Sequence, residues 1–272
     1  MTQATLAAPF AFDGVGLHTG AEAHVEVRPA AENTGLVFAL GEDAFEVPAL
    51  AEYVTETSRA TVIGRDGRTV STVEHLLSAL FGMGVTNAVV AVRGPEIPVT
   101  DGSGKQFVDM IENVGLRPQP APRKTLKLAE PYYLRDGDRL IAALPSDGFR
   151  VRFLADFPAP VGTQYYDGPM TPTVYRTDIC GARTFGYLHE VEALLARGLA
   201  RGGSLENAIV FDASGPMRPL RWPNEVVRHK VLDLLGDFAL LGAWPQFEIL
   251  AIKSGHALHA AAALALRKGT VP

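Results

Sequence analysis

The chain has 272 residues, 47% of them hydrophobic and 20% charged, which is enough apolar material for one large or two medium cores. Its formal net charge is −5 and its Lys and Arg are scattered singly, which argues against nucleic acid as a partner. A single cysteine, no charged signal-peptide start and no apolar run near ~18 residues predict a cytoplasmic protein without a disulfide or a transmembrane segment.

The first half of the chain predicts strands on either side of one helix. Hydrophobic and polar residues alternate over 24–29 and 35–40, as in half-buried strands, and 87–94 is a continuous β-branched run. Residues 71–84 combine the apolar spacing of a helix with two closing glycines, which predicts a helix there.

A proline-rich segment divides the chain. Residues 117–123 hold three prolines and no core-forming residue, which predicts a linker between a domain of residues 1–118 and one of residues 124–272. The second half predicts strands at 124–135, 139–144, 149–157 and 247–253, and helices at 185–198, 224–242 and 256–268. Because strands and helices do not strictly alternate, the expected fold class is α+β.

The helix expected at 224–242 carries a polar stripe. One face is apolar, and His229, Asp233 and Asp237 follow at i, i+4 and i+8 on the opposite side. A solvated surface with one His–Asp pair is one interpretation. However, the flanking residues are less polar than a free surface should be. A His and an Asp one turn apart also present a nitrogen and a carboxylate to the same point, which suits a divalent metal.

Residues 71–75, Ser-Thr-Val-Glu-His, allow two interpretations. Ser71 and Glu74 have the spacing of a capping box, in which Glu74 folds back onto the amide of the first residue. Alternatively, the positive helix end keeps His75 neutral, as a metal ligand must be. Glu74 can then reach a metal's water without binding the metal itself, which is the arrangement that metal-assisted hydrolysis requires.

Two histidines lie where the last predicted strand meets the last helix. His256 follows a strand end and a glycine turn, a place from which catalytic groups often project, although a helix-capping or surface role is also open. The i, i+3 spacing of His256 and His259 is common by chance, so His259 is given no role. His18 and His24 are expected to be structural.

Two nucleotide-binding motifs fail. Residues 101–106 resemble the end of a phosphate-binding P-loop, but Gln106 stands where Ser or Thr is required. Gly14 and Gly16 lack the third glycine of the dinucleotide fingerprint. Local patterns thus favour a metal site without showing which residues meet in space.

Six segments in order along the chain resemble one family, the zinc-dependent UDP-3-O-acyl-N-acetylglucosamine deacetylases of lipid A biosynthesis. They are residues 14–20, 71–80, 94–104, 182–212, 228–242 and 253–258. The resemblance implies two similar α+β domains, each a two-layer sandwich of sheet and helices, with the active site at their interface. It also implies hydrolysis of the substrate's acetamide to acetate and a free amine, the committed step of lipid A biosynthesis.

The resemblance also implies the role of each site residue. Zn²⁺ is expected on His75, His229 and Asp233, with Fe²⁺ as the other ion that could take its place. Glu74 matches the general base, and His256 matches the protonated group that stabilises the oxyanion and supplies the amine's proton.

The remaining matches surround these groups. Asp237 matches the carboxylate that orients His256, Thr184 a hydroxyl near the oxyanion, and Lys230 a substrate-binding cation. The expected partner is a UDP-sugar with a fatty acyl chain, bound by a monomer. Positions around the substrate and its acyl chain are matched by Leu17, Phe185 and Tyr187.

Two departures and three alternatives stand beside this interpretation. Residues 156–158, Asp-Phe-Pro, lack the His that the family usually carries, and residues 57–59 are less apolar than in many members, so acyl-chain preference is open. The chain could instead act on another N-acetylated sugar, or bind without catalysis. Non-haem iron oxygenases also use two His and a carboxylate, but on an all-β scaffold with a tight His-x-Asp pair.

Overall fold

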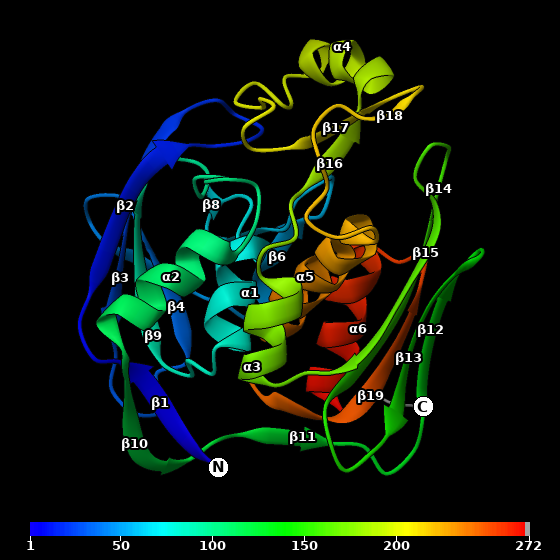
Figure 1. Ribbon diagram of the computed structural model, residues 1–272. Coiled ribbons are helices and arrows are strands. Elements are labelled where there is room, and N and C mark those ends of the chain that lie inside the picture. Colours follow the sequence, from blue (N-terminus) through cyan, green and yellow to red (C-terminus); the bar gives the residue numbers. More distant parts are fainter. Residues whose placement is uncertain (270–272) are drawn as a thin grey trace.

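Within the described residues, 1–269, two large sheets with the same strand layout enclose a layer of helices (Figure 1). The structure is a computed structural model. Each sheet consists of two hairpins separated by a central strand that comes last in the sequence, and the elements immediately before and after that strand are both α-helices. The expected α+β class, with two similar layered units, is confirmed.

The first sheet is built from residues 10–93. Its strands, in spatial order, are β2 (Phe10–Val15), β3 (Glu22–Pro29), β9 (Ala88–Arg93), β4 (Leu36–Leu40) and β5 (Phe45–Pro48). Central β9 runs antiparallel to β3 and parallel to β4. Val25 and Val27 on β3 are buried in the core while their neighbours are not, as a period of two residues requires. A 3-10 helix and a small sheet follow: η1 (Ala51–Tyr53), β6 (Val54–Glu56), β7 (Val62–Arg65) and β8 (Arg68–Val70).

The second sheet repeats this layout. Its strands, in spatial order, are β12 (Tyr132–Asp136), β13 (Arg139–Pro145), β19 (Trp244–Ile252), β14 (Arg150–Phe157) and β15 (Gly162–Pro169), with β11 (Thr125–Lys127) also paired to β19. Central β19 is antiparallel to β13 and parallel to β14, as β9 is to its neighbours. The single strand expected over 124–135 is therefore two strands, interrupted at 128–131, where Pro131 has no amide hydrogen for pairing.

The helices meet between the sheets. They are α1 (Glu74–Gly82), α2 (Lys105–Val114), α3 (Pro172–Val174), η2 (Tyr175–Ile179), α5 (Glu225–Ala239) and α6 (His256–Lys268). α1 and α5 pack directly on each other. Gly236 makes this approach possible, because a Cβ at that position would overlap the backbone carbonyl of Glu74. α5 is thus buried on nearly every side, so the interpretation of its polar stripe as a solvated surface is wrong.

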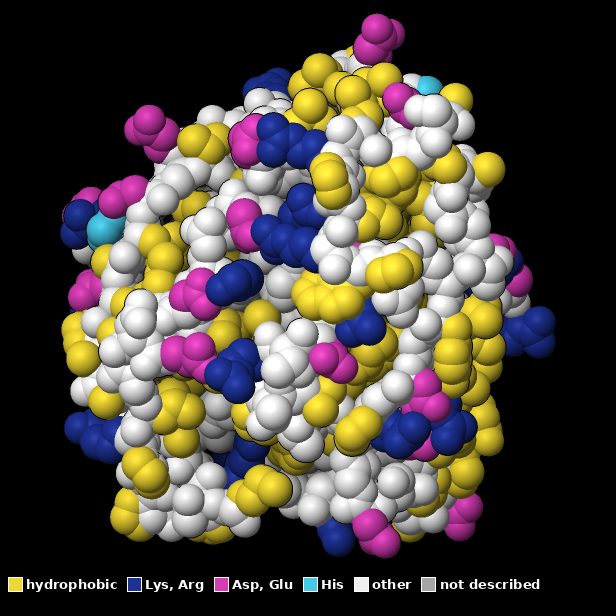
Figure 2. All heavy atoms as spheres, in the orientation of Figure 1, with side chains coloured by type: hydrophobic (Ala, Val, Ile, Leu, Met, Phe, Trp, Pro, Cys, Tyr) yellow, Lys and Arg dark blue, Asp and Glu magenta, His cyan; other side chains and the backbone are white. Residues whose placement is uncertain are grey.

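Another small sheet, of three strands, lies above the helix layer together with α4 (Leu188–Ala196) (Figure 1). The strands are β16 (Phe185–Tyr187), β17 (Ile209–Asp212) and β18 (Gly215–Pro216). The helix expected at 185–198 is therefore preceded by a strand, since residues 185–187 pair in parallel with β17. Hydrophobic side chains gather over this part in Figure 2, and Leu188, Leu195, Leu205 and Met217 are exposed there.

The segment expected to be a linker is an ordered strand. β10 (Leu116–Pro122) pairs antiparallel with β1 (Thr2–Leu6), and Gln119 is buried. A two-stranded sheet has a free edge on each strand, where a proline costs no hydrogen bond. The domain boundaries at residues 118 and 124 stay a prediction. No helix within residues 1–269 is both long and apolar enough to cross a membrane.

Candidate metal and proton-transfer site

Three predicted ligands converge where α1 and α5 touch. His75 is in the first turn of α1, and His229 and Asp233 are one turn apart on α5. Asp233 Oδ1 lies 3.3 Å from His229 Nε2 and 3.6 Å from His75 Nε2, and all three side chains are buried. Two imidazole nitrogens and one carboxylate facing a common point are a donor set for a divalent transition metal.

The charges of these groups also suit a metal. Burial lowers the pKa of His229 to about 4, so its imidazole is neutral. His229 Nδ1 donates to the carbonyl of Ala182 over 3.0 Å, which leaves the Nε2 lone pair facing Asp233. Burial alone would raise the pKa of Asp233, but His229 and Lys230 bring it well below its usual value. Lys230 Nζ lies 2.7 Å from Asp233 Oδ2.

His75 carries a further sign of an incomplete polar environment. Its Nδ1 is buried and has no hydrogen-bond partner among the described residues. Buried polar atoms are normally paired with protein or with ordered water. The nitrogen that faces Asp233 is the other one, Nε2, so the unpaired Nδ1 does not itself mark the point that the three ligands share. A divalent cation binds imidazole nitrogens and ionised carboxylates, so these three residues fit such an ion.

Glu74 faces the site rather than its own helix end. The capping-box interpretation is wrong, because the amide of Ser71 donates to the carbonyl of Pro95 and Glu74 Oε2 accepts the amide of Thr61 over 3.0 Å. The other oxygen, Oε1, lies 3.9 Å from His256 Nε2. Burial raises the pKa of Glu74, which moves this carboxylate towards the range of a general base.

Asp237 holds His256 from behind. Asp237 Oδ2 accepts from His256 Nδ1 over 2.8 Å, and Oδ1 accepts from the Thr61 hydroxyl over 2.5 Å. Burial opposes the charged form of His256, but Asp237 outweighs it and raises the pKa of His256 to about 9. In turn His256 brings the pKa of Asp237 to about 2, against the effect of its own burial. The pair is ionic at neutral pH.

The sequence interpretation missed two members of this network, Thr61 and His259. His259 is fully buried and also lies 2.8 Å from Asp237 Oδ2, through its Nδ1. The only sequence signal was the i, i+3 spacing of His256 and His259 in one helical turn. Nothing in the sequence pointed to Thr61, which lies just before β7 and reaches the site from the other unit.

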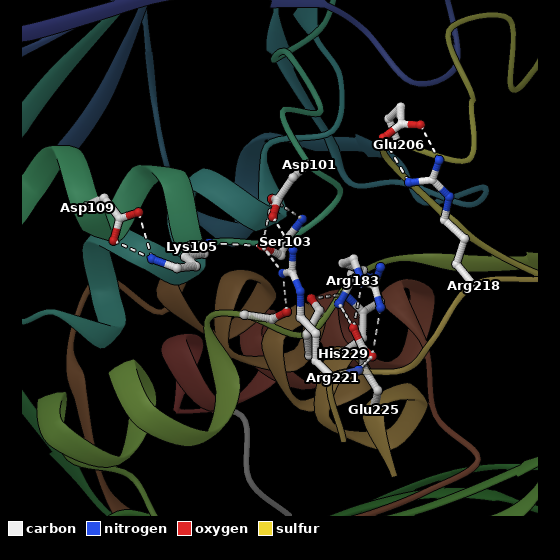
Figure 3. Close-up of polar contacts among 12 residues, drawn as sticks. Asp101, Ser103, Lys105, Asp109, Arg183, Glu206, Arg218, Arg221, Glu225 and His229 are labelled. Carbon is white, nitrogen blue, oxygen red and sulfur yellow. Dashed lines mark hydrogen bonds and ion pairs between the residues drawn. The ribbon is translucent and has the colours of Figure 1, made fainter. Parts of the chain in front are cut away.

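An ion-pair cluster fixes the loop of residues 181–184 to the start of α5 (Figure 3). Arg183 donates to Glu225 from its backbone amide over 3.1 Å and from Nε over 2.9 Å, and Glu225 is fully buried. Arg221 donates to the carbonyl of Gly181 over 2.7 Å and to Asp101 over 2.8 Å. This loop therefore has little freedom to move relative to α5.

The loop positions two predicted site residues. The carbonyl of Ala182 is the one that holds His229. Thr184 donates its amide to the carbonyl of Gly102 over 2.7 Å, and its own carbonyl accepts the amide of Ile209 over 2.8 Å. Thr184 is thus fixed on both sides by backbone hydrogen bonds.

The failed P-loop motif has a structural role that sequence reasoning did not assign. Gly102, within residues 101–106, has a φ of +82°, and a Cβ there would overlap the carbonyl of Asn207. Only glycine lets this turn approach the segment before β17 that contains Asn207.

The predicted substrate positions differ in their placement. The ring of Phe185 meets His229 edge-on, with centroids 6.4 Å apart. The hydroxyl of Tyr187 instead donates to the carbonyl of Pro158 over 2.8 Å. Leu17 lies in the loop after β2, and its carbonyl accepts an amide from the loop after α4.

Comparison with known proteins identifies the family. The model of the family described as LpxC: UDP-3-O-acyl N-acetylglycosamine deacetylase matches residues 3–268. A UDP-3-O-acyl-N-acetylglucosamine deacetylase of Phenylobacterium zucineum is 46% identical, over 98% of this chain and 93% of the relative. Proteins of that name from Myxococcus xanthus and Syntrophotalea carbinolica are 45% and 43% identical, over 94% and 93% of this chain and 83% and 84% of their own lengths. The chain belongs to the UDP-3-O-acyl-N-acetylglucosamine deacetylase family.

Proposed function

We propose that this protein hydrolyses the acetamide of UDP-3-O-acyl-N-acetylglucosamine to acetate and the free amine, as the committed step of lipid A biosynthesis. One observation carries the proposal beyond family membership. Asp233, which completes a two-His, one-carboxylate donor set, and Asp237, which pairs ionically with His256, are one turn apart on α5, and Glu74 faces both groups. Amide hydrolysis needs these three functions: an electrophile, a base and an acid.

We propose His75, His229 and Asp233 as ligands of Zn²⁺, which suits nitrogen and carboxylate donors, with Fe²⁺ as the alternative ion. When bound, zinc supplies Lewis acidity, which polarises the acetamide carbonyl and lowers the pKa of a water molecule towards ~7. The neutral imidazole of His229 and the ionised carboxylate of Asp233 support this assignment.

Glu74 is proposed as the general base. Its carboxylate takes a proton from the water as the new C–O bond forms at the acetamide carbon. The raised pKa of Glu74 supports this role, since a carboxylate with an ordinary pKa is a weak base at neutral pH.

His256 is proposed as the general acid. In its protonated form it stabilises the oxyanion and then gives its proton to the departing nitrogen as the C–N bond breaks. Its pKa of about 9 supports a protonated ring at neutral pH, and Asp237 maintains that pKa. The hydroxyl of Thr184 is a second candidate donor to the oxyanion, and one such donor typically lowers the barrier by roughly 3–4 kcal/mol.

Substrate contacts are assigned to the site's edge. Lys230 is proposed to bind a polar group of the substrate, supported by its place beside Asp233. Phe185, Tyr187 and Leu17 are proposed around the sugar and the acyl chain. The exposed hydrophobic side chains near α4 support an apolar ligand on this side of the molecule (Figure 2). The monomeric state and the cytoplasmic location stay predictions.

The test is acetate release from the UDP-3-O-acyl sugar by the zinc-loaded protein, with the same sugar lacking the acyl chain as the comparison substrate. We expect release that stops on chelation and returns with zinc, and that is lost in Glu74→Ala and His256→Ala. A zinc-loaded protein that binds the nucleotide sugar but releases no acetate would contradict the proposal. Equal release from other N-acetylated sugars would contradict the assigned substrate.

A further inference from the structure

Asp237 is shared by two imidazoles, and only one of them has a role so far. His256 and His259 lie in the first turn of α6, and both place Nδ1 at 2.8 Å from the same oxygen, Asp237 Oδ2. We propose that His259 is a positioning residue for the hydrolysis, which holds the Asp237 carboxylate in the orientation that presents His256 to Glu74. This inference rests on the proposed function.

The hydrogen bonds of His259 define its protonation. An ionised carboxylate only accepts, so His259 Nδ1 must donate to Asp237. On the other side of the ring, Nε2 lies 2.8 Å from the hydroxyl of Ser254, which is also buried. Burial lowers the pKa of His259, so the ring is neutral and Nε2 accepts from this hydroxyl. Ser254 thereby selects the tautomer that donates to Asp237.

The orientation of Asp237 depends on His259 because His259 supplies one of the hydrogen bonds that hold the two carboxylate oxygens. Asp237 Oδ1 is held by Thr61, while Oδ2 serves both histidines. The Thr61 hydroxyl also lies 3.2 Å from His256 Nδ1. Without the donor of His259, the carboxylate can rotate, and Thr61 can then compete with it for His256. His259 removes that alternative by holding Oδ2 in place.

Several acidic groups surround His256, and one of them is in hydrogen-bond contact with it. Acidic groups face it from α5, through Asp237 and Asp233, and from α1, through Glu74. Of these three carboxylates, Asp237 is the one at hydrogen-bond distance, since Glu74 Oε1 is 3.9 Å from His256 Nε2. A rotation of Asp237 therefore alters the shortest hydrogen bond that orients the ring and its reactive Nε2.

Two substitutions of His259 by amide side chains of similar size and polarity, Asn and Gln, test the positioning role. In His259→Asn the amide nitrogen takes the place of Nδ1 and still reaches Asp237. In His259→Gln it takes the place of Nε2 and reaches Ser254 instead. We expect His259→Gln to lower kcat about tenfold with KM and bound zinc little changed, and His259→Asn to retain kcat within about threefold. As a control, His24→Gln changes a half-exposed histidine paired with Asp13 and should leave kcat unchanged.

A second measurement reports on His256 directly. The chemical shift of the Nδ1–H proton of His256 can be followed by NMR in protein with ¹⁵N-labelled histidine. We expect this chemical shift to change in His259→Gln and to stay unchanged in His259→Asn. This signal can be read whether or not acetate is released, so an inactive parent protein would contradict the proposed hydrolysis and not the positioning role. Equal kcat in the parent and His259→Gln would overturn the inference. So would an unmoved His256 signal, or an equal loss in both variants.

Discussion

His229 and His256 are both imidazoles with little solvent exposure that are held at Nδ1, but at neutral pH His229 is neutral and His256 is positively charged. A backbone carbonyl, from Ala182, stands behind His229, and burial lowers the pKa of that ring to about 4. A carboxylate, Asp237, stands behind His256, and it overcomes the same effect of burial and raises the pKa to about 9. The charge of the partner at Nδ1 thus separates a proposed metal ligand from a proposed acid.

The two halves of the site are also supported differently. His229 depends on a loop that the ion pair of Arg183 with the buried Glu225 fixes to α5 (Figure 3). His256 depends on a network of side chains around Asp237, drawn from both units of the fold. The first support reaches His229 through a backbone carbonyl, whereas the second reaches His256 directly through side chains.

The largest expected effect is loss of the metal. His229→Ala removes a nitrogen ligand, so acetate release should fall to background and zinc should be lost on dialysis. Zinc content and acetate release measured together check this. His24→Ala, a histidine on the exposed face of β3, is the control, and retained zinc in His229→Ala would refute the ligand assignment.

Asp237→Asn makes the partner of His256 neutral, like the partner of His229. The pKa of His256 should then fall, because burial is no longer opposed by a carboxylate. We expect kcat to drop roughly 10³-fold, within the usual contribution of acid–base catalysis, while zinc stays bound. Kinetics and zinc content check this, and a parallel loss of zinc would show that the two halves are not separate.

Arg183→Lys tests the support of the metal half. It keeps the charge beside Glu225 but loses the forked contact, so the Ala182 carbonyl should hold His229 less firmly. We expect zinc affinity to fall about tenfold, measured by competition with a chelator. The matched control is Arg218→Lys, which alters the exposed pair of Arg218 and Glu206 (Figure 3). Equal affinity in both variants would contradict the role of the loop.

The smallest effect is the pH dependence of the parent protein. His256 acts when protonated and its pKa is raised to about 9, so activity should hold below that pH and fall as pH rises through it, by about tenfold at one pH unit beyond. Glu74 acts when ionised, so activity should also fall as the pH is lowered. The raised pKa of Glu74 shifts this acidic limb of the profile to higher pH. A profile of kcat/KM against pH measures both limbs. An alkaline limb that Asp237→Asn leaves unmoved would contradict the comparison.

The sequence by itself predicted most central strands and the helices that carry the site, because periodicity reflects burial on one face. It failed where tertiary contacts override local preference. The prolines of 117–123 form a strand because β1 is available as a partner, and the start of 185–198 is a strand because β17 lies beside it. The proposed metal ligands were predicted from the resemblance, since spacing alone could not bring residue 75 to residue 229.

Tertiary structure alone decided what each polar group does. Ser71 and Glu74 have capping-box spacing, but α5 approaches through Gly236 and Glu74 is buried facing His256, not its own helix end. His259 has the same local pattern as a chance histidine, and only the position of Asp237 on another helix gives it a partner. Local sequence sets which groups a helix presents. Their charge and role depend on burial and on partners far away in the chain, which no local pattern encodes.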